Sequence, residues 1–165
     1  MKRRRFSRWL RWLDRNEHLG INYPGIYAIA YTRNRLAGKL FTWRPDIIYI
    51  GMTNGIGGLR SRLQQFDNTI AGKTGHGGAD RVRYKFRKYK PLSQRLYVAV
   101  AVFDCDVTSA SPTDLRKMGD VAQFEYRCLA DFAERFERVP AFNDKKNAPK
   151  FSLTVGRAKR RVSAA

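Results

Sequence analysis

The chain has 165 residues, with 33 lysine and arginine residues against 14 aspartate and glutamate residues, a formal net charge of +19. Its length suits one domain with one core, and its 21 aromatic residues argue against disorder throughout. No apolar stretch is long enough to span a membrane. The two cysteines, Cys105 and Cys128, make no disulfide framework and are typical of the cytoplasm. The positive charge predicts a polyanionic partner and favours nucleic acid.

The first 20 residues form a basic segment with helical periodicity. Phe6, Trp9, Leu10 and Leu13 fall on one face of a helix, and the segment has a net charge of +5. We expect an amphipathic helix over residues 1–20, packed on the domain with its arginines in solvent or on phosphate. A basic organelle presequence or a membrane-surface helix is the alternative interpretation.

Two strands and a helix are predicted next along the chain. Ile26 to Thr32 and Asp46 to Ile50 are runs rich in isoleucine and tyrosine, the composition of neighbouring strands. A glycine-rich loop after Gly51 leads into a predicted helix from Leu59 to Phe66. The loop lacks the nucleotide-binding glycine patterns, so it indicates little alone.

The stretch from Thr69 to Asp80 is rich in glycine and predicts a loop that contains His76. In the alternating segment Arg81 to Lys88, a strand would place four cations on one face. Such a strand is equally consistent with a solvated sheet edge and with nucleic-acid contact.

The most apolar strand is predicted from Leu96 to Asp104, in the centre of the sheet. A long helix follows, with Thr113 as its expected N-cap and its end at Glu137 or Arg138. This part of the chain, residues 103–138, holds eight acidic and five basic residues, so the basic surface is expected elsewhere.

A single carboxylate interrupts the apolar stripe of this long helix. Glu125 is expected in the middle of a stripe made of Met118, Ala122, Leu129, Phe132 and Phe136. Burying an unpaired carboxylate costs several kcal/mol, so Glu125 should be protonated, paired with a base, or bound to a cation. A structural salt bridge and a metal-binding carboxylate are both consistent with the pattern.

Five sequence features follow one another in a recognisable order: Gly25-Ile26-Tyr27 in the first strand, Tyr49-Ile50-Gly51 in the second, an arginine on the following helix, Glu125 on a later helix and Asn143 just after it. Together they resemble the GIY-YIG nuclease family. The resemblance covers about residues 24 to 147. It implies an α/β (α+β) domain with a three-stranded antiparallel sheet flanked by helices, which cleaves phosphodiester bonds of DNA.

The resemblance also implies a role for each matching residue. Tyr27 and Tyr49 would be the active-site tyrosines, with Tyr27 as general base, and Arg62 the phosphate-binding arginine. Glu125 would hold one Mg²⁺ or Mn²⁺ ion per active site, and Asn143 would support the site. Arg60 competes with Arg62, because the preceding loop is about three residues longer than usual, but the sequence after Arg62 matches the family better.

Some relatives have a histidine at the position of Phe66. His76 is the only plausible replacement for it here, and Lys73 is a cation that would favour the phenolate form of Tyr27. The residues expected to hold the DNA are Arg60, Arg81, Arg83, Lys85, Arg87 and Lys88.

The domain organisation predicted from these patterns has three parts: the N-terminal helix over residues 1–20, the nuclease-like domain over 21–147 and a basic tail over 148–165. A cytoplasmic, nucleoid-associated enzyme with DNA as its partner and no membrane contact is expected. Two protomers or a partner subunit would allow both strands to be cut. The alternative is a non-catalytic nucleic-acid-binding module that keeps only the basic surface.

Overall fold

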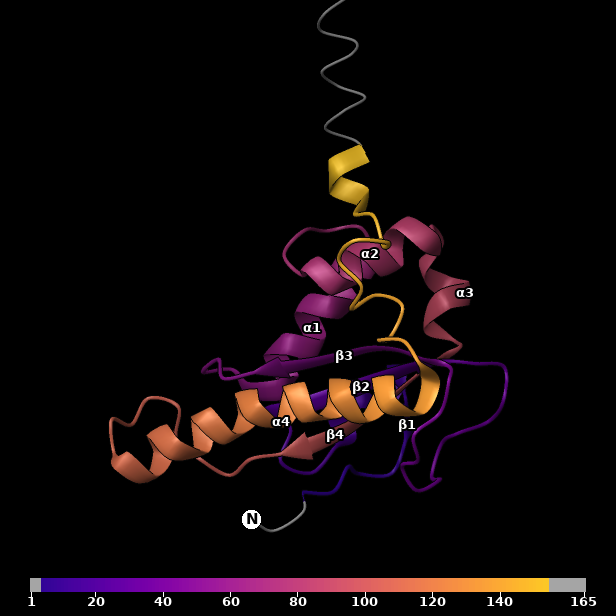
Figure 1. Cartoon of the computed structure of the whole chain (residues 1–165). Helices are drawn as coiled ribbons and strands as arrows, with labels where there is room; N and C mark the ends of the chain where they lie inside the picture. The colour runs from indigo at the N-terminus through magenta and orange to yellow at the C-terminus, as the bar shows by residue number, and fades with distance from the viewer. Residues whose placement is uncertain (1–3, 155–165) are drawn as a thin grey trace, which may run out of the picture.

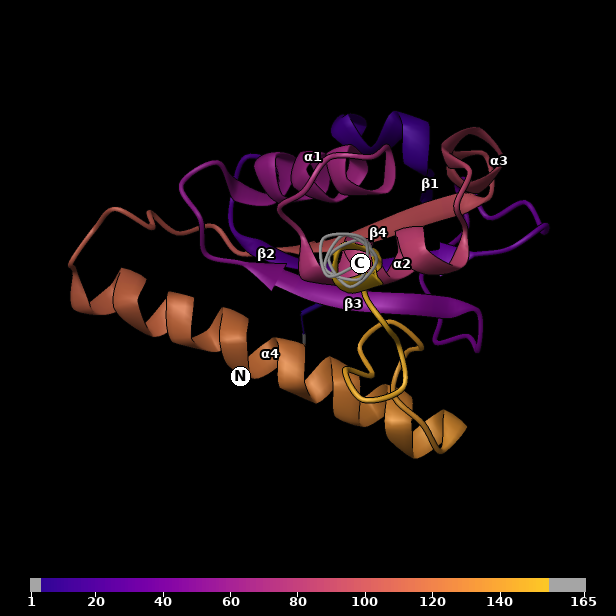
Figure 2. The same ribbon diagram turned by 90° about the horizontal axis from the view of Figure 1, so that it is seen from above.

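The computed structural model describes residues 4–154, which form an antiparallel four-stranded sheet with helices on both faces (Figures 1 and 2). The strand order is β1-β4-β2-β3, so β4 and β2 are central. The strands are β1 (Leu10–Arg11), β2 (Gly25–Tyr31), β3 (Ile47–Thr53) and β4 (Leu96–Val102). The helices are the 3₁₀ helix η1 (Trp12–Glu17), α1 (Gly58–Ile70), α2 (Gly77–Lys85), α3 (Tyr89–Ser93) and α4 (Pro112–Phe136).

The mixed α/β class and the central place of the strand after Leu96 are confirmed. The predicted strand count of three is wrong, because the two residues of β1 add a fourth strand beside β4. Within residues 4–154, no helix is long and apolar enough to cross a membrane.

The sheet separates two hydrophobic cores. In β2 and β4 nearly every residue is buried, because helices cover both faces. One face packs against α1 through Leu59, Leu63 and Phe66, whose spacing places them on one side of that helix. The other face packs against α4, and Figure 2 shows α1 and α4 on opposite sides of the sheet.

The predicted N-terminal helix is wrong. The chain is extended over residues 4–9, where the amide of Ser7 donates to the carbonyl of Val100 at 2.8 Å and the amide of Val100 donates to Ser7 Oγ at 3.0 Å. The segment therefore lies along the edge of β4, and only η1 is helical. Hydrogen bonding to an open sheet edge outweighed a helical pattern that extends over only eight residues, from Phe6 to Leu13. The membrane-surface helix has no counterpart within residues 4–20.

The predicted strand over Arg81 to Lys88 is also wrong, because this segment begins within α2. His76 caps the helix by accepting the Ala79 amide at its Nδ1. The outer edge of β3, which such a strand could join, is occupied: the Phe142 amide donates to the Ile48 carbonyl at 3.0 Å, and Asn143 bonds Ile50. A segment with a cap and no open edge beside it forms a helix.

The long helix α4 agrees with its predicted extent but not with its predicted cap. Ser111 is the N-cap, since its Oγ accepts the Asp114 amide at 3.1 Å, and Thr113 lies inside the helix. The fully buried residues are Val121, Cys128 and Phe132. Glu125 thus lies half-buried beside the core-facing stripe, where a carboxylate keeps access to solvent.

Residues 140–154, which include the start of the predicted basic tail, form a segment that we call the strap. After α4, residues 140–150 run past β3 and lead to a helical turn over residues 151–154 that sits against α2 (Figure 1). Residues 155–165 of the predicted tail lie outside the described residues.

Candidate active site

Two tyrosines from neighbouring strands form the floor of the candidate site. Tyr27 lies on β2 and Tyr49 on β3, with ring centroids 6.0 Å apart. Tyr27 is paired in register with Gly51, and a Cβ atom at Gly51 would lie 2.6 Å from the Tyr27 hydroxyl. A Cβ at Gly78 would lie 2.3 Å from the Tyr49 ring. Both glycines are therefore required for the tyrosine rings to occupy these positions.

His76 joins the tyrosines from the start of α2. Its Nε2 lies 2.8 Å from the Tyr27 hydroxyl, and its Nδ1 accepts the Ala79 amide at 3.2 Å. Burial, reinforced by the nearby Arg62 guanidinium, lowers the pKa of His76 to about 3, so the ring is neutral. A neutral imidazole that accepts at Nδ1 carries its proton on Nε2. His76 therefore donates to the Tyr27 oxygen, and the phenol proton is left for another acceptor.

Phe66 holds this histidine in place. The Phe66 ring lies 4.9 Å from the His76 ring and 5.6 Å from the Tyr49 ring, measured between centroids. The Thr69 hydroxyl accepts the His76 amide at 3.1 Å. Some relatives have a histidine where this chain has Phe66, and here the imidazole of His76, the N-cap of α2, lies against the Phe66 ring.

Arg62 reaches the tyrosines from α1. Its guanidinium donates from Nη1 to Gln65 Oε1 at 3.1 Å, and its Nε is buried with no hydrogen-bond partner. No carboxylate within residues 4–154 forms an ion pair with it. Arg60 instead donates to Asn22 Oδ1 at 2.8 Å. Of the two competing arginines, the structure brings Arg62 to the tyrosines.

Burial dominates the electrostatics of the tyrosine pair. It raises the pKa of the Tyr27 phenol well above its usual range, and the Arg62 guanidinium opposes that increase. The pKa of Tyr49 is raised for the same reason and is likewise lowered again by Arg62. Charge on Glu125 raises both pKa values further. The phenols are therefore protonated in the free protein near neutral pH.

Glu125 approaches the same cluster from α4. Burial raises the pKa of its carboxyl, whereas Arg62, Lys145 and the backbone amide of Met52 oppose that rise. No ion pair within the described part of the chain holds the carboxylate. The structural salt bridge considered from the sequence is therefore not formed there. A half-buried carboxylate without an ion pair is consistent with a ligand for a hard divalent cation.

No group of three or more His, Cys, Asp or Glu residues that could hold a metal occurs within residues 4–154. A site at Glu125 would therefore have one protein carboxylate and would complete its coordination with water and phosphate oxygens. Mg²⁺ commonly binds in this way. The donor set of the site fits Mg²⁺ or Mn²⁺ and does not fit a tightly held structural ion.

Asn143 positions the site without joining the cluster. Its Oδ1 accepts the Ile50 amide at 2.8 Å and its Nδ2 donates to the Ile50 carbonyl at 2.7 Å. Both ends of the amide are thus bound to the backbone between Tyr49 and Gly51. Asn143 extends the hydrogen bonding of the sheet edge and fixes the strand that carries Tyr49.

Not every residue predicted for the site lies there. Lys73 is exposed in the loop after α1, and its only hydrogen bond within residues 4–154 is from its amide to the Asn68 carbonyl. Sequence reasoning missed Gly78 and Lys145. The pair Gly77-Gly78 directly after the histidine was the available signal for Gly78, because adjacent glycines permit close approach of a ring. Lys145 follows Asn143 by two residues and had no signal of its own.

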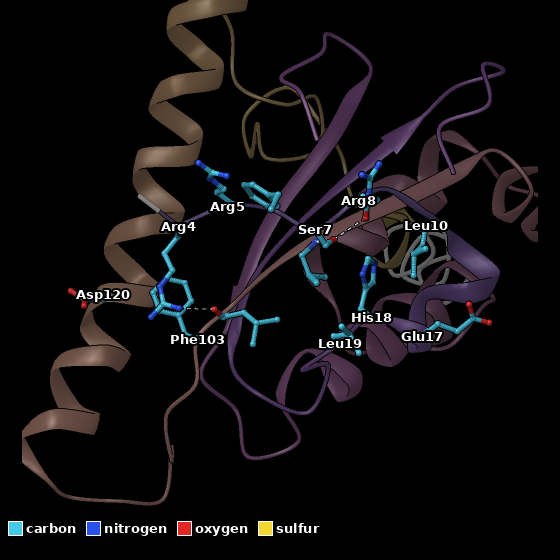
Figure 3. A pocket seen from close by; sticks show the side chains of 13 residues that line it. Arg4, Arg5, Ser7, Arg8, Leu10, Glu17, His18, Leu19, Phe103 and Asp120 are labelled. Carbon is cyan, nitrogen blue, oxygen red and sulfur yellow. Dashed lines mark hydrogen bonds between the residues drawn. The ribbon is translucent and has the colours of Figure 1, made fainter. Parts of the chain in front are cut away.

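A hollow of about 1010 Å³ lies far from this cluster, at the β1–β4 edge of the sheet (Figure 3). Arg4 there stacks on Phe103 at 4.4 Å and donates to the Val102 carbonyl at 3.1 Å. His18 bonds the Val98 carbonyl. These polar groups complete the hydrogen bonds of the β4 edge, so their roles are structural.

Comparison of the chain with models of protein families, with curated proteins and with solved structures returned no match.

Proposed function

We propose that this protein is a metal-dependent nuclease of the GIY-YIG type that hydrolyses phosphodiester bonds of DNA. The observation that carries the proposal is the Arg62 guanidinium. It is partly buried beside two tyrosine hydroxyls, no carboxylate within residues 4–154 pairs with it, and its Nε has no acceptor. A phosphate group would provide both the charge and the acceptor.

Arg62 is suited to the charge that develops during phosphodiester hydrolysis. The guanidinium is planar, stays protonated at any working pH and presents parallel N–H groups to two phosphate oxygens. Donors fixed before the reaction stabilise the transition state more than donors that must reorganise. The bond from Arg62 to Gln65 limits the freedom of the guanidinium in this way.

Tyr27 is the proposed general base for the attacking water. His76 donates a hydrogen bond to the Tyr27 oxygen, an interaction that strengthens when the phenol loses its proton. The negative charge of Glu125 now opposes ionisation of Tyr27, so neutralisation of that charge lowers the phenol pKa. Tyr27 is therefore protonated in the free protein, and a cation at Glu125 would increase the fraction of phenolate that can accept a proton from water.

Glu125 would hold the divalent cation, which when bound supplies Lewis acidity at the departing 3′ oxygen. The Met52 amide and the Lys145 cation favour the ionised form of the carboxyl group, because both lower its pKa. Asn143 keeps β3 and its Tyr49 in register beside this group.

A non-catalytic DNA-binding module is the second candidate. The raised pKa values of Tyr27 and Tyr49 favour it, because a protonated phenol is a poor base. This candidate predicts binding without cleavage at any metal concentration.

The test is nicking of supercoiled plasmid with Mg²⁺ by the wild type and by Glu125→Gln, which keeps the shape of the side chain but not its charge. We expect a loss of about a thousandfold or more in the nicking rate, with DNA binding in EDTA unchanged. Glu134→Gln, an exposed position on the same helix, is the matched control and should cleave normally. Equal nicking by wild type and Glu125→Gln would exclude the proposed site.

A further inference from the structure

The surface formed by α2 and the strap carries many cations and few acids. Residues 81–90 contain six lysine and arginine residues and no acidic residue. In the described part of the chain none of these cations forms an ion pair. Lys150 adds a further cation, since its Nζ would lie 3.5 Å from a Cβ atom at Gly77. We call this set, Arg81, Arg83, Arg87 and Lys150, the cationic ridge.

One aromatic ring from the strap organises two arginines of the ridge. The guanidinium carbon of Arg83 lies 4.0 Å from the centre of the Phe151 ring, and that of Arg87 lies 5.3 Å from the same centre. Arg83 also donates to the Gly72 carbonyl at 2.9 Å, and Arg87 donates to the Tyr84 carbonyl at 2.9 Å. Each guanidinium is thereby fixed by its face and by one N–H group, and Arg87 has a second aromatic contact, because its guanidinium carbon lies 5.1 Å from the centre of the Tyr84 ring.

The remaining strap contacts hold Phe151 in place. The Ser152 hydroxyl donates to Asp80 Oδ2 at 2.5 Å, and Arg81 Nε donates to the Ala148 carbonyl at 3.1 Å. Asp80 is the only acidic residue of α2. It accepts the hydrogen bond from Ser152 and forms no ion pair with the neighbouring arginines of that helix. The strap therefore anchors the ring and engages the only carboxylate of α2.

Holding Arg83 and Arg87 on one ring is unfavourable for the protein without a ligand. Two guanidinium groups that share one ring repel each other, and holding each in place costs side-chain entropy. Each guanidinium has five N–H groups, of which Arg83 and Arg87 each use one within residues 4–154. The remaining donors are thus oriented in advance without an acceptor among residues 4–154, which is what a row of phosphate groups requires.

The ridge is also continuous with the candidate site. His76 is the N-cap of α2 and bonds Tyr27, so the helix that carries the arginines starts at the tyrosine pair. A hollow of about 230 Å³ between the strap and the start of α2 is lined by His76 and Lys150. Phosphates bound along α2 would lead directly to that cluster.

We propose that α2 and the strap together form a preorganised binding surface for the phosphate backbone of duplex DNA, in which Phe151 is a positioning residue for Arg83 and Arg87. The inference rests on the proposed function for the choice of DNA as partner. It assigns to the strap a role in holding the duplex that is separate from cleavage.

The experiment measures the affinity of the full chain for a fluorescein-labelled 20-base-pair duplex in EDTA, between about 50 and 300 mM salt. Phe151→Leu keeps apolar volume and removes the ring face, and we expect about tenfold weaker binding. Phe151→Tyr should bind like the wild type. The double variant Arg83→Ala/Arg87→Ala should reduce the salt slope by about two contacts, roughly 0.9 per contact, and adding Phe151→Leu to it should change nothing further.

Arg135→Ala, which removes one exposed cation from α4, is the matched control and should leave the affinity within about twofold. Thermal unfolding of each variant verifies that it is folded. Unchanged affinity in Phe151→Leu would overturn the positioning role, and unchanged affinity in the double arginine variant would overturn the surface. Binding to anionic phosphatidylserine vesicles that depends on these residues, without binding to duplex, would also overturn it. Because EDTA prevents metal-dependent cleavage, these affinities can be measured and interpreted even if the protein is not a nuclease.

Discussion

Two clusters on α1 contain the same kinds of side chain and differ in whether those side chains satisfy one another. In the first, Asp67 pairs with Arg15 at 3.0 Å and accepts hydrogen bonds from Trp12 at 2.6 Å and Tyr89 at 2.9 Å. In the second, Arg62 lies with Tyr27, Tyr49 and Glu125, yet none of these groups forms an ion pair within residues 4–154. Both arginines have a buried Nε without a partner, so the missing carboxylate is what distinguishes them.

The difference separates a structural cluster from a candidate functional one. Asp67 joins η1, α1 and α3, and its ion pair with Arg15 leaves no unbalanced charge for a ligand. The Arg62 cluster joins α1, β2, β3 and α4, and it keeps charge and hydrogen-bonding capacity that only a further molecule would use. Substitutions in the first cluster should therefore act on stability, and substitutions in the second on activity.

The largest expected effect is on catalysis at the open cluster. Arg62→Lys keeps the charge and loses the planar fork, so the nicking rate of plasmid should fall by about a hundred- to a thousandfold. The free energy of unfolding, measured with urea, should change by less than about 0.5 kcal/mol. Arg15→Lys should show the reverse pattern, with lower stability and normal nicking while folded. If Arg62→Lys and Arg15→Lys lose similar amounts of stability, the two clusters do not differ in the way described.

A smaller effect is expected on stability at the closed cluster. Asp67→Asn leaves Arg15 buried without its counter-ion, and the free energy of unfolding should fall by about 3 kcal/mol. Asp46→Asn breaks a more exposed pair with Arg44 and should cost less than about 1 kcal/mol. Urea titration of both variants, with nicking per folded molecule, gives the comparison. A loss of nicking in folded Asp67→Asn would show that this cluster also acts in catalysis.

The last expected effect, up to about 1.4 kcal/mol for each pH unit, is a change in the pH dependence of stability. The pKa of His76 is about 3 in the folded protein against 6.5 ordinarily, so the unfolded chain binds more protons between these values. Stability from neutral His76 is therefore present above about pH 6.5 and is lost as the pH falls toward 3, at up to about 1.4 kcal/mol per pH unit.

His76→Asn keeps an N-cap acceptor and removes this titration, so its stability should fall less steeply from pH 6.5 to 4.5. Burial also lowers the pKa of His18, at the other edge of the sheet, so part of the slope left in His76→Asn should come from that residue. Urea unfolding at several pH values makes the measurement. If stability falls equally steeply with pH in the wild type and the variant, the folded protein does not lower the pKa of His76.

Most of the elements could be predicted from local pattern, and the exceptions share one cause. The strands at Gly25–Tyr31, Ile47–Thr53 and Leu96–Val102 were evident from composition, and α4 from its spacing. The N-terminal segment and α2 were each assigned the wrong structure. In both cases the hydrogen bonding at a sheet edge decided the structure. The backbone of Ser7 bonds the open edge of β4, whereas Asn143 occupies the outer edge of β3.

For the candidate site, the sequence supplied the residue types and their order, and the fold supplied their convergence. Tyr27, Tyr49, Arg62 and Glu125 are separated by up to 98 positions, yet each affects the pKa of another. Sequence could not choose firmly between Arg60 and Arg62, because two positions differ by about 200° around a helix and the direction of the site was unknown. The bond from Arg60 to Asn22 makes that choice.

The sequence by itself determined the charge, the aromatic content, the two glycine-tyrosine triplets and the helix that carries Glu125. Only the tertiary structure decided that His76 contacts Tyr27, that Phe151 lies under Arg83 and Arg87, and that Asn143 binds backbone. The physical reason is that composition and period are local properties of the chain. Whether a polar group finds a partner depends on what distant segments place beside it.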